Sequence, residues 1–163
     1  MSDSGTTWQQ ARERQISAMR MTCEILGHIL RNVSDERARA LRDGPDGWSI
    51  VEIVCHLRDF DDIFLSRARM MLERDHPPLP AYDHEAMAIE RAYQAQSLDE
   101  AYGALNASRA NFARFFETLT PEQWARGGLH PERDSFSMTD ALMQVSAHDL
   151  DHLEQITRVL RDG

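Results

Sequence analysis

The chain has 163 residues with 18 basic and 27 acidic side chains, which gives a formal charge of −9 and a hydrophobic content of 42%. This size and composition are typical of one globular domain, so we expect a single domain over residues 1–163. The acidic balance argues against nucleic-acid binding, and no apolar run approaches the roughly 18–20 residues of a membrane span. With two cysteines and a polar N-terminal segment, we expect a cytoplasmic protein without disulfides.

Four segments carry apolar residues at the three- and four-residue spacing of an amphipathic helix. We predict helices over residues 7–32, 49–74, 97–118 and 137–160. Each begins with a residue that can cap a helix and a partner three positions later: Thr7 with Gln10, Ser49 with Glu52, Ser97 with Glu100, and Ser137 with Asp140. Alternating runs and hairpin signals are missing, so the sequence predicts an all-α protein.

The connections between these helices are unequal in length. Residues 75–97 form the longest one, with three prolines and a candidate short helix over residues 84–94. Pro121 follows a capping threonine and predicts a short helix start, whereas residues 127–135 read as loop. A long second connection favours a four-helix bundle with a crossover link between helices two and three over a simple up-and-down bundle.

The seven histidines are the unusual feature of the composition. Four of them lie beside proline or charged residues, or opposite the apolar stripe of a helix, and are predicted to be solvated: His28, His76, His84 and His130. His148 and His152 are four residues apart, so they share one helix face at about 5–6 Å between Cβ atoms. This face borders the predicted core, and the pair can hold a metal ion or pack at the core edge with ordinary hydrogen bonds.

His56 lies at the core margin of the second helix and adds a third inward imidazole. It is about 10 Å along the helix from Ser49, while His152 and His148 are about 12 and 18 Å from Leu160. If helices two and four are antiparallel, the three side chains reach similar depths in the bundle. Three histidines with open coordination positions are typical of a catalytic metal site.

The chain contains WSIVEIVCHL at residues 48–57 and HDLDHLEQI at residues 148–156. Together these segments resemble the DinB/YfiT-like four-helix bundle superfamily, and the likeness extends over nearly the whole chain. The resemblance implies a bundle in up-down-down-up order that binds one divalent metal ion through His56, His148 and His152, and it implies a homodimer. Asp151 stands where many members have a further histidine, which leaves the metal ligands intact but weakens any close transfer of function.

Metal-assisted chemistry also needs a proton acceptor, for which two carboxylates are candidates. Glu52 lies one turn before His56 and acts either as a catalytic base or as a helix cap. Asp149 falls inside the apolar arc of its helix, where it either orients a ligand histidine or pairs with an arginine. Asp59 and Asp151 are expected to face solvent.

The sequence leaves three functional readings open. The first is a metal-dependent enzyme acting on a small molecule, of the thiol S-transferase or hydrolase type that the resemblance implies, with a low-molecular-weight thiol as a candidate substrate. The second is a non-catalytic, homodimeric metal-binding or stress-response protein, and the third is a bundle whose histidines are merely packed. Zinc and nickel are our first choices for the ion, with iron and copper as alternatives, because imidazole suits all four. No nucleic-acid or membrane partner is expected.

Overall fold

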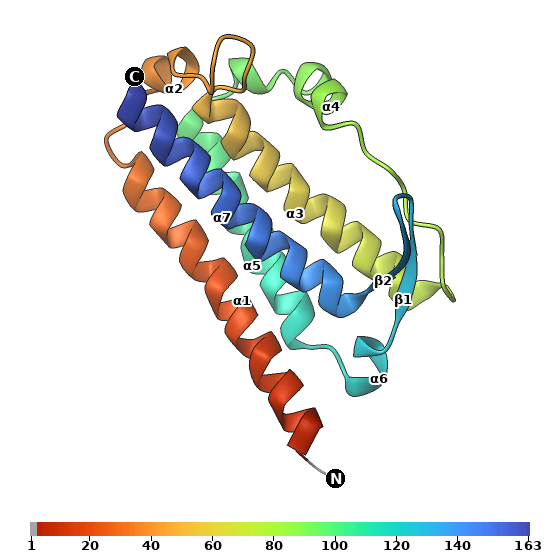
Figure 1. Cartoon of the computed structure of the whole chain (residues 1–163). Helices are drawn as coiled ribbons and strands as arrows, with labels where there is room; N and C mark the ends of the chain where they lie inside the picture. The colour runs from red at the N-terminus through yellow and green to blue at the C-terminus, as the bar shows by residue number, and fades with distance from the viewer. Residues whose placement is uncertain (1–2) are drawn as a thin grey trace.

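The computed structural model describes residues 3–163, with side chains from residue 7 onward. Four long helices form its bundle: α1 (Asp3–Leu30), α3 (Ile50–Glu73), α5 (Leu98–Glu117) and α7 (Met138–Asp162). Figure 1 shows α1 and α7 running in one direction and α3 and α5 in the other, so the chain goes up, down, down and up. The predicted four-helix bundle is therefore confirmed. Within the described residues, no helix combines the length and apolar content that a membrane crossing requires.

Side-chain caps explain where three of these helices begin. Ser49 accepts the backbone N–H of Glu52, and the Glu52 carboxylate accepts the backbone N–H of Ser49 in return. Ser137 and Asp140 form the same reciprocal pair at the start of α7. Ser97 caps α5 through its hydroxyl group. The predicted starts of helices two, three and four are thus confirmed.

Two helical stretches differ from the prediction. α1 begins at Asp3, so Thr7 and Gln10 lie inside the helix and the capping box predicted for them is wrong. Extending a formed helix by one turn is much easier than nucleating a new one, which favours the earlier start. The short helix α2 (Asp35–Ala40) was not predicted, although Ser34 caps it. Six residues are too few to display a periodic apolar pattern.

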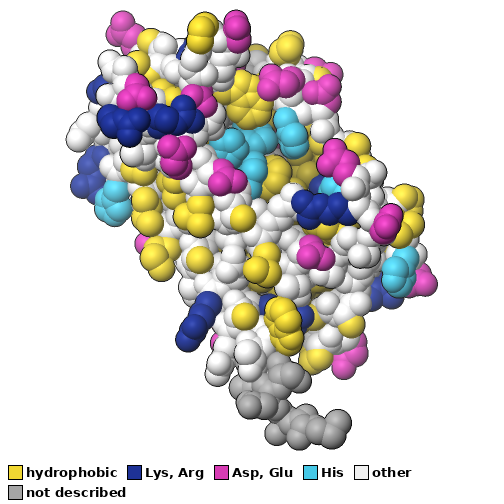
Figure 2. Space-filling view, viewed as in Figure 1, with side chains coloured by type: hydrophobic (Ala, Val, Ile, Leu, Met, Phe, Trp, Pro, Cys, Tyr) yellow, Lys and Arg dark blue, Asp and Glu magenta, His cyan; other side chains and the backbone are white. Residues whose placement is uncertain are grey.

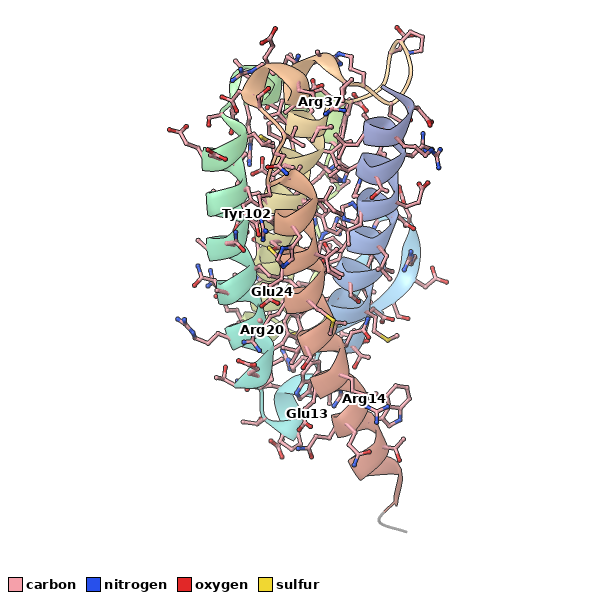
Figure 3. All side chains as sticks on the ribbon, turned by 90° about the vertical axis from the view of Figure 1, so that its left-hand side faces the viewer. Glu13, Arg14, Arg20, Glu24, Arg37 and Tyr102 are labelled. Atoms are coloured by element: carbon pink, nitrogen blue, oxygen red, sulfur yellow. The ribbon has the colours of Figure 1, made fainter. Side chains whose placement is uncertain are left out.

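The four long helices enclose one continuous interior. α1 packs against α5 and α7, and α3 packs against the same two helices from the other side. Figure 3 shows α1 in front of the bundle, between α5 and α7. The interior is filled by two apolar clusters whose fully buried members include Phe64, Phe112 and Met138 in one and Leu26, Ile53 and Ile156 in the other. The pairing of α3 with α7 sets the two histidine-bearing helices side by side.

The segment between α3 and α5, residues 74–97, is only partly helical. It contains α4 (His84–Glu90) and the 3₁₀ turn η1 (Tyr93–Ala95), close to the short helix predicted there. Figure 1 shows α4 at the end of the bundle where α3 begins. After α5 comes α6 (Pro121–Trp124), which has proline at its first position, as predicted. The structure adds a complete capping box between Thr120 and Gln123.

The segment predicted as loop, residues 127–135, forms most of a β-hairpin. Strands β1 (Gly127–His130) and β2 (Arg133–Ser137) pair in antiparallel fashion, with an irregularity in register between Gly128 and His130. The loop prediction is therefore wrong. Strands of only four and five residues are too short and irregular to show the alternating pattern from which a strand is predicted.

The hairpin gains a third extended segment from the connection after α3. Leu79 donates its backbone N–H to the carbonyl of Leu129 at 2.8 Å, and Leu129 donates to the carbonyl of Pro77 at 2.9 Å. The two backbones approach so closely at Gly128 that a Cβ atom there would lie 2.8 Å from the Pro77 carbonyl oxygen. We call these joined segments, residues 77–79 and 127–137, the strap.

Candidate metal centre

The three predicted histidines meet between α3 and α7. His56 Nε2 lies 2.9 Å from His148 Nε2, which lies 3.1 Å from His152 Nε2. Their ligand atoms all fall within 4.8 Å of one another, so they form a group able to hold a metal ion. The antiparallel arrangement of the two helices, on which the predicted convergence depended, is the one seen in Figure 1.

The spacing of these nitrogens fits a single ion. Nitrogen ligands of a tetrahedral ion lie about 2.0–2.1 Å from it and hence about 3.4 Å from one another. Aromatic contacts fix two of the rings. Phe60 stacks on His148 with ring centres 3.6 Å apart, and Trp48 meets His56 edge-on at 4.7 Å. The trio is therefore arranged before any ligand binds.

Burial keeps these imidazoles neutral. Burial first, and the neighbouring histidines second, lower the pKa of His56 to about 3 and that of His148 to about 2. Burial also lowers the pKa of His152, although the hydrogen bond that its ring donates to Gln155 opposes the shift. Neutral imidazole is the form that binds metal ions, so the environment favours ligation at neutral pH.

A second set of side chains orients His152. Its Nδ1 lies 2.7 Å from Gln155 Oε1, an acceptor, which places the ring proton on Nδ1 and leaves Nε2 free to ligate. Gln155 in turn donates to Asp43 at 2.8 Å, and Asp43 is held by Arg158. The sequence analysis did not predict this series of hydrogen bonds, because Asp43 lies in a loop that is distant in sequence from His152.

A fourth histidine borders the trio. His84, predicted to be solvated, is half-buried, with its ring centre 4.9 Å from that of His56. Burial lowers its pKa. The prediction is wrong because the connection after α3 folds back and sets the first residue of α4 beside the site. Figure 2 shows histidines gathered in a hollow on this face of the molecule.

The other three histidines lie outside the trio. His28 and His76 are exposed, as predicted. His130 is half-buried and packs on Phe136 with ring centres 5.3 Å apart, so the prediction that it is solvated is wrong. Formation of the hairpin, which was not predicted, produces this burial.

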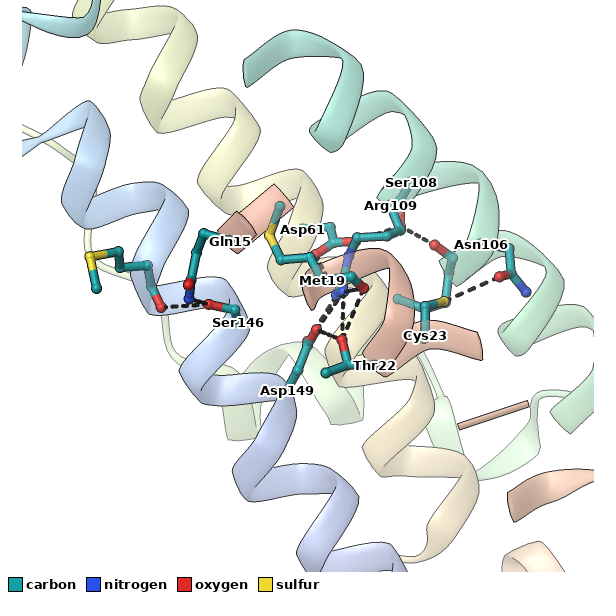
Figure 4. Close-up of polar contacts among 12 residues, drawn as sticks. Gln15, Met19, Thr22, Cys23, Asp61, Asn106, Ser108, Arg109, Ser146 and Asp149 are labelled. Carbon is teal, nitrogen blue, oxygen red and sulfur yellow. Dashed lines mark hydrogen bonds and ion pairs between the residues drawn. The ribbon is translucent and has the colours of Figure 1, made fainter. Parts of the chain in front are cut away.

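The two candidate catalytic carboxylates have structural partners. The Glu52 carboxylate accepts two hydrogen bonds from Ser49 and lies 3.1 Å from Arg42, so the helix-cap alternative is present. Asp149 is buried and pairs with Arg109 through both oxygens, which is the arginine alternative (Figure 4). A catalytic role for either carboxylate stays a prediction.

Asp59 corrects a further expectation. Instead of facing solvent it is buried, with Arg58 and Arg91 each 2.7 Å away and the hydroxyl of Tyr93 as a third donor. Burial alone would raise its pKa, but the hydrogen bonds from Arg58 and Tyr93 lower it. Arg91 and Tyr93 come from the long connection, whose path the helical phase of α3 cannot predict. Asp151 is exposed, as expected.

Hollows large enough for a small molecule lie at two places on the described part of the chain. The larger, about 1000 Å³, lies between the N-terminal half of α1, the end of α5 and α6, and no histidine or cysteine lines it. The smaller, about 250 Å³, shares the side chains of Phe60 and His84 with the surroundings of the trio. A molecule bound in the smaller pocket would therefore be next to the candidate metal centre.

Comparison with known proteins agrees with this architecture. The protein named "Putative metal-dependent hydrolase YfiT" from Bacillus subtilis is 23% identical over 155 residues, which cover 94% of this chain and 83% of that protein. "Putative metal-dependent hydrolase OB0413" from Oceanobacillus iheyensis is 24% identical over 139 residues, covering 85% and 79%.

The fold itself has a counterpart among solved structures. That of YfiT, described as "a probable metal-dependent hydrolase with an unusual four-helix bundle topology", superposes with a TM-score of 0.83 at 22% identity and covers 93% of this chain and 86% of that one. A family model described as "DinB superfamily" matches residues 7–156. Since this match spans most of the sequence, the chain belongs to the DinB superfamily.

Proposed function

We propose that this protein is a metal-dependent hydrolase whose metal ion is held by His56, His148 and His152. The observation that carries the proposal is the convergence of three neutral Nε2 atoms with 2.9 and 3.1 Å spacing. The names of the two relatives, both of which include "metal-dependent hydrolase", support a hydrolytic reaction. A divalent ion in such a site supplies Lewis acidity and brings the pKa of a coordinated water towards about 7.

The protein side chains around the trio have distinct roles in this proposal. Gln155 holds His152 with its Nε2 directed at the other ligands. Phe60 and Trp48 form apolar walls that exclude bulk water from one side. We assign His84 as the proton acceptor, because it is neutral at pH 7 and no hydrogen bond to its ring is present among the described residues.

Metal analysis of the purified protein tests the site. Wild type is expected to bind one divalent ion per chain, and His152→Ala to bind little, because two imidazoles remain. Glu154→Gln, an exposed change two residues away, is the matched control and should keep full metal content. Equal, substoichiometric metal in wild type and His152→Ala would overturn the site.

Turnover tests the reaction. We expect slow hydrolysis of p-nitrophenyl esters or phosphates that is lost on chelation and restored by zinc or nickel. His84→Gln should lower kcat while leaving metal content unchanged. Turnover of a low-molecular-weight thiol with an electrophile, without hydrolysis, would favour the thiol S-transferase alternative. A metal-loaded homodimer inactive in both assays would favour the non-catalytic one.

A further inference from the structure

The smaller pocket is built from four parts of the chain around one basic side chain. α3 supplies Phe60, Phe64 and Arg67, the long connection supplies Tyr82, the hairpin supplies His130, and Gln144 comes from α7. Gln144 lies one helical turn before His148, so the pocket extends from the trio towards Arg67. A ligand filling it would have one end at the ligand histidines and the other at the guanidinium group.

Arg67 is held in place without a counter-charge. It is only 6% exposed, yet no carboxylate lies within 4.0 Å of it in the part of the chain that the structure describes. One Nη2 proton goes to the carbonyl of Pro80 at 2.6 Å, and the guanidinium lies over the rings of Phe64 and Tyr82 at 5.2 and 5.3 Å. Its buried Nε has no hydrogen-bond partner among the described residues. A buried, uncompensated cation is costly unless an anion binds to it.

His130 presents a second donor to the same space. Its Nδ1 accepts the backbone N–H of Glu132 at 3.2 Å, so the ring proton of the neutral form lies on Nε2. That nitrogen is 3.5 Å from Nη1 of Arg67, and the contact therefore brings together two N–H donors. Donors that face one another in this way favour an acceptor that bridges them.

The charged groups around Arg67 also leave its positive charge without a close partner. Burial lowers its pKa, and the groups that oppose this shift, Tyr82 and Glu132, act only at a distance. Glu132 is exposed on the hairpin and does not form an ion pair with it. Gln144 adds a buried Oε1 acceptor that has no hydrogen-bond partner in the described part of the chain and that a donor group on a ligand would satisfy. The pocket thus contains more unused hydrogen-bonding capacity than a packed interior tolerates.

We propose that this pocket binds an oxyanion group of the substrate, a carboxylate or a phosphate, between Arg67 and His130, with the remainder of the molecule directed at the histidine trio. The identity of the reacting end rests on the proposed function, but the anion site does not require a metal ion. Phe60, Phe64 and Ile63 line the pocket between the two ends, so the substrate has an apolar body. Arg67 is then a specificity-determining residue.

Calorimetric titration of the full chain tests the proposal with three probes: benzoate, phenyl phosphate and neutral benzamide. Titrations use both zinc-loaded and chelator-treated protein, because an oxyanion also binds an open metal position. Benzoate or phenyl phosphate should bind more tightly than benzamide in both forms, and the tighter of the two identifies the oxyanion class. Arg67→Gln should weaken anion binding about tenfold or more, with benzamide unchanged.

Arg126→Gln is the matched control, since Arg126 also donates to backbone carbonyls but does not line the pocket. It should leave all three affinities unchanged. If circular dichroism shows that Arg67→Gln does not fold, His130→Ala replaces it, with a smaller loss expected for the anions alone.

Three results would overturn the anion site: equal affinities for benzoate, phenyl phosphate and benzamide, anion binding that needs zinc, or binding unaffected by the Arg67 or His130 change. Metal content is measured separately. Anion binding through Arg67 in a protein that takes up no metal would refute the proposed function alone. Metal-dependent hydrolysis with Arg67-independent anion binding would refute the anion site alone.

Discussion

Two buried polar clusters share α3 and α7, and they are built on opposite principles. In the first, Arg109 donates all five N–H groups, to Asp61, Asp149 and the carbonyl of Met19, and Thr22 donates to Asp149 (Figure 4). The carboxylates raise the pKa of Arg109 even though burial by itself would lower it. Every strong donor in this cluster has an acceptor.

In the histidine trio, by contrast, the hydrogen-bonding capacity of the buried nitrogens is not satisfied. Three Nε2 atoms converge, and the buried Nδ1 atom of His148 has no hydrogen-bond partner in the part of the chain that the structure describes. Unsatisfied buried groups reduce stability, so a fold keeps them where a ligand completes them. In our proposal the Arg109 cluster stabilises the bundle, whereas the trio holds the metal ion. Variants of each cluster test whether the two clusters differ in this way.

The largest effect is expected from Arg109→Leu. Removal of the guanidinium leaves Asp61 and Asp149 buried without a counter-charge, which should lower the free energy of unfolding by about 3–5 kcal/mol. Urea denaturation followed by circular dichroism measures the change. Arg20→Leu, which removes an exposed ion pair with Glu117, is the control and should change stability by less than about 1 kcal/mol. Similar losses for both variants would contradict the contrast.

The next effect is the pH dependence of the metal-free protein. The folded pKa values of about 3 for His56 and about 2 for His148 lie below the ordinary 6.5, so the unfolded chain binds more protons below pH 6.5. The free energy of unfolding that these histidines contribute is fully present above pH 6.5. As the pH is lowered below 6.5, this contribution decreases by about 1.4 kcal/mol per pH unit for each histidine. Urea titrations between pH 7.5 and pH 4.5 measure this slope. A stability that stays constant over this range would contradict it.

A smaller effect concerns the residue that orients a ligand. Gln155→Leu removes the acceptor at Nδ1 of His152 and should weaken metal binding about 10- to 100-fold. Competition with a chromogenic chelator measures the affinity. Thr157→Val, a neighbouring change on the same helix that leaves His152 untouched, should have no such effect. Equal metal affinities in wild type and Gln155→Leu would show that the hydrogen bond to Gln155 is not needed to orient the His152 ring.

The smallest effect on stability is expected from His148→Leu in the metal-free protein. The substitution removes an unsatisfied buried nitrogen and keeps an apolar side chain beside Phe60, so the free energy of unfolding should change by about 1 kcal/mol or less. Metal binding should nevertheless be lost, and the acid slope should lose the share of one histidine. A loss as large as that for Arg109→Leu would remove the distinction between the clusters.

The sequence predicted the parts of this molecule that depend on helical phase. Capping pairs such as Ser49 with Glu52 located helix starts, and the phases of His56, His148 and His152 predicted their convergence. Both signals are local, because they depend on spacing within a single helix. The bundle order came from the family resemblance.

The contacts that the sequence did not predict depend on where the irregular segments lie in space. His84 joins the surroundings of the trio and Arg91 reaches Asp59 because the long connection folds back over α3. His130 reaches Arg67 because a hairpin forms where loop was predicted. Such contacts involve residues dozens of positions apart that follow no period, so a single sequence gives no signal for them.

The strap has a consequence for substitutions in the lining of the smaller pocket. Its two segments are joined by backbone hydrogen bonds at Leu79 and Leu129, in which the side chains of Tyr82 and His130 take no part. Tyr82 and His130, next to those bonds, are therefore free to mutate without loss of the join, while the imidazoles on α3 and α7 are set by rigid helices. A substitution at Tyr82 or His130 would therefore change the lining of the smaller pocket, while the join and the positions of His56, His148 and His152 are retained.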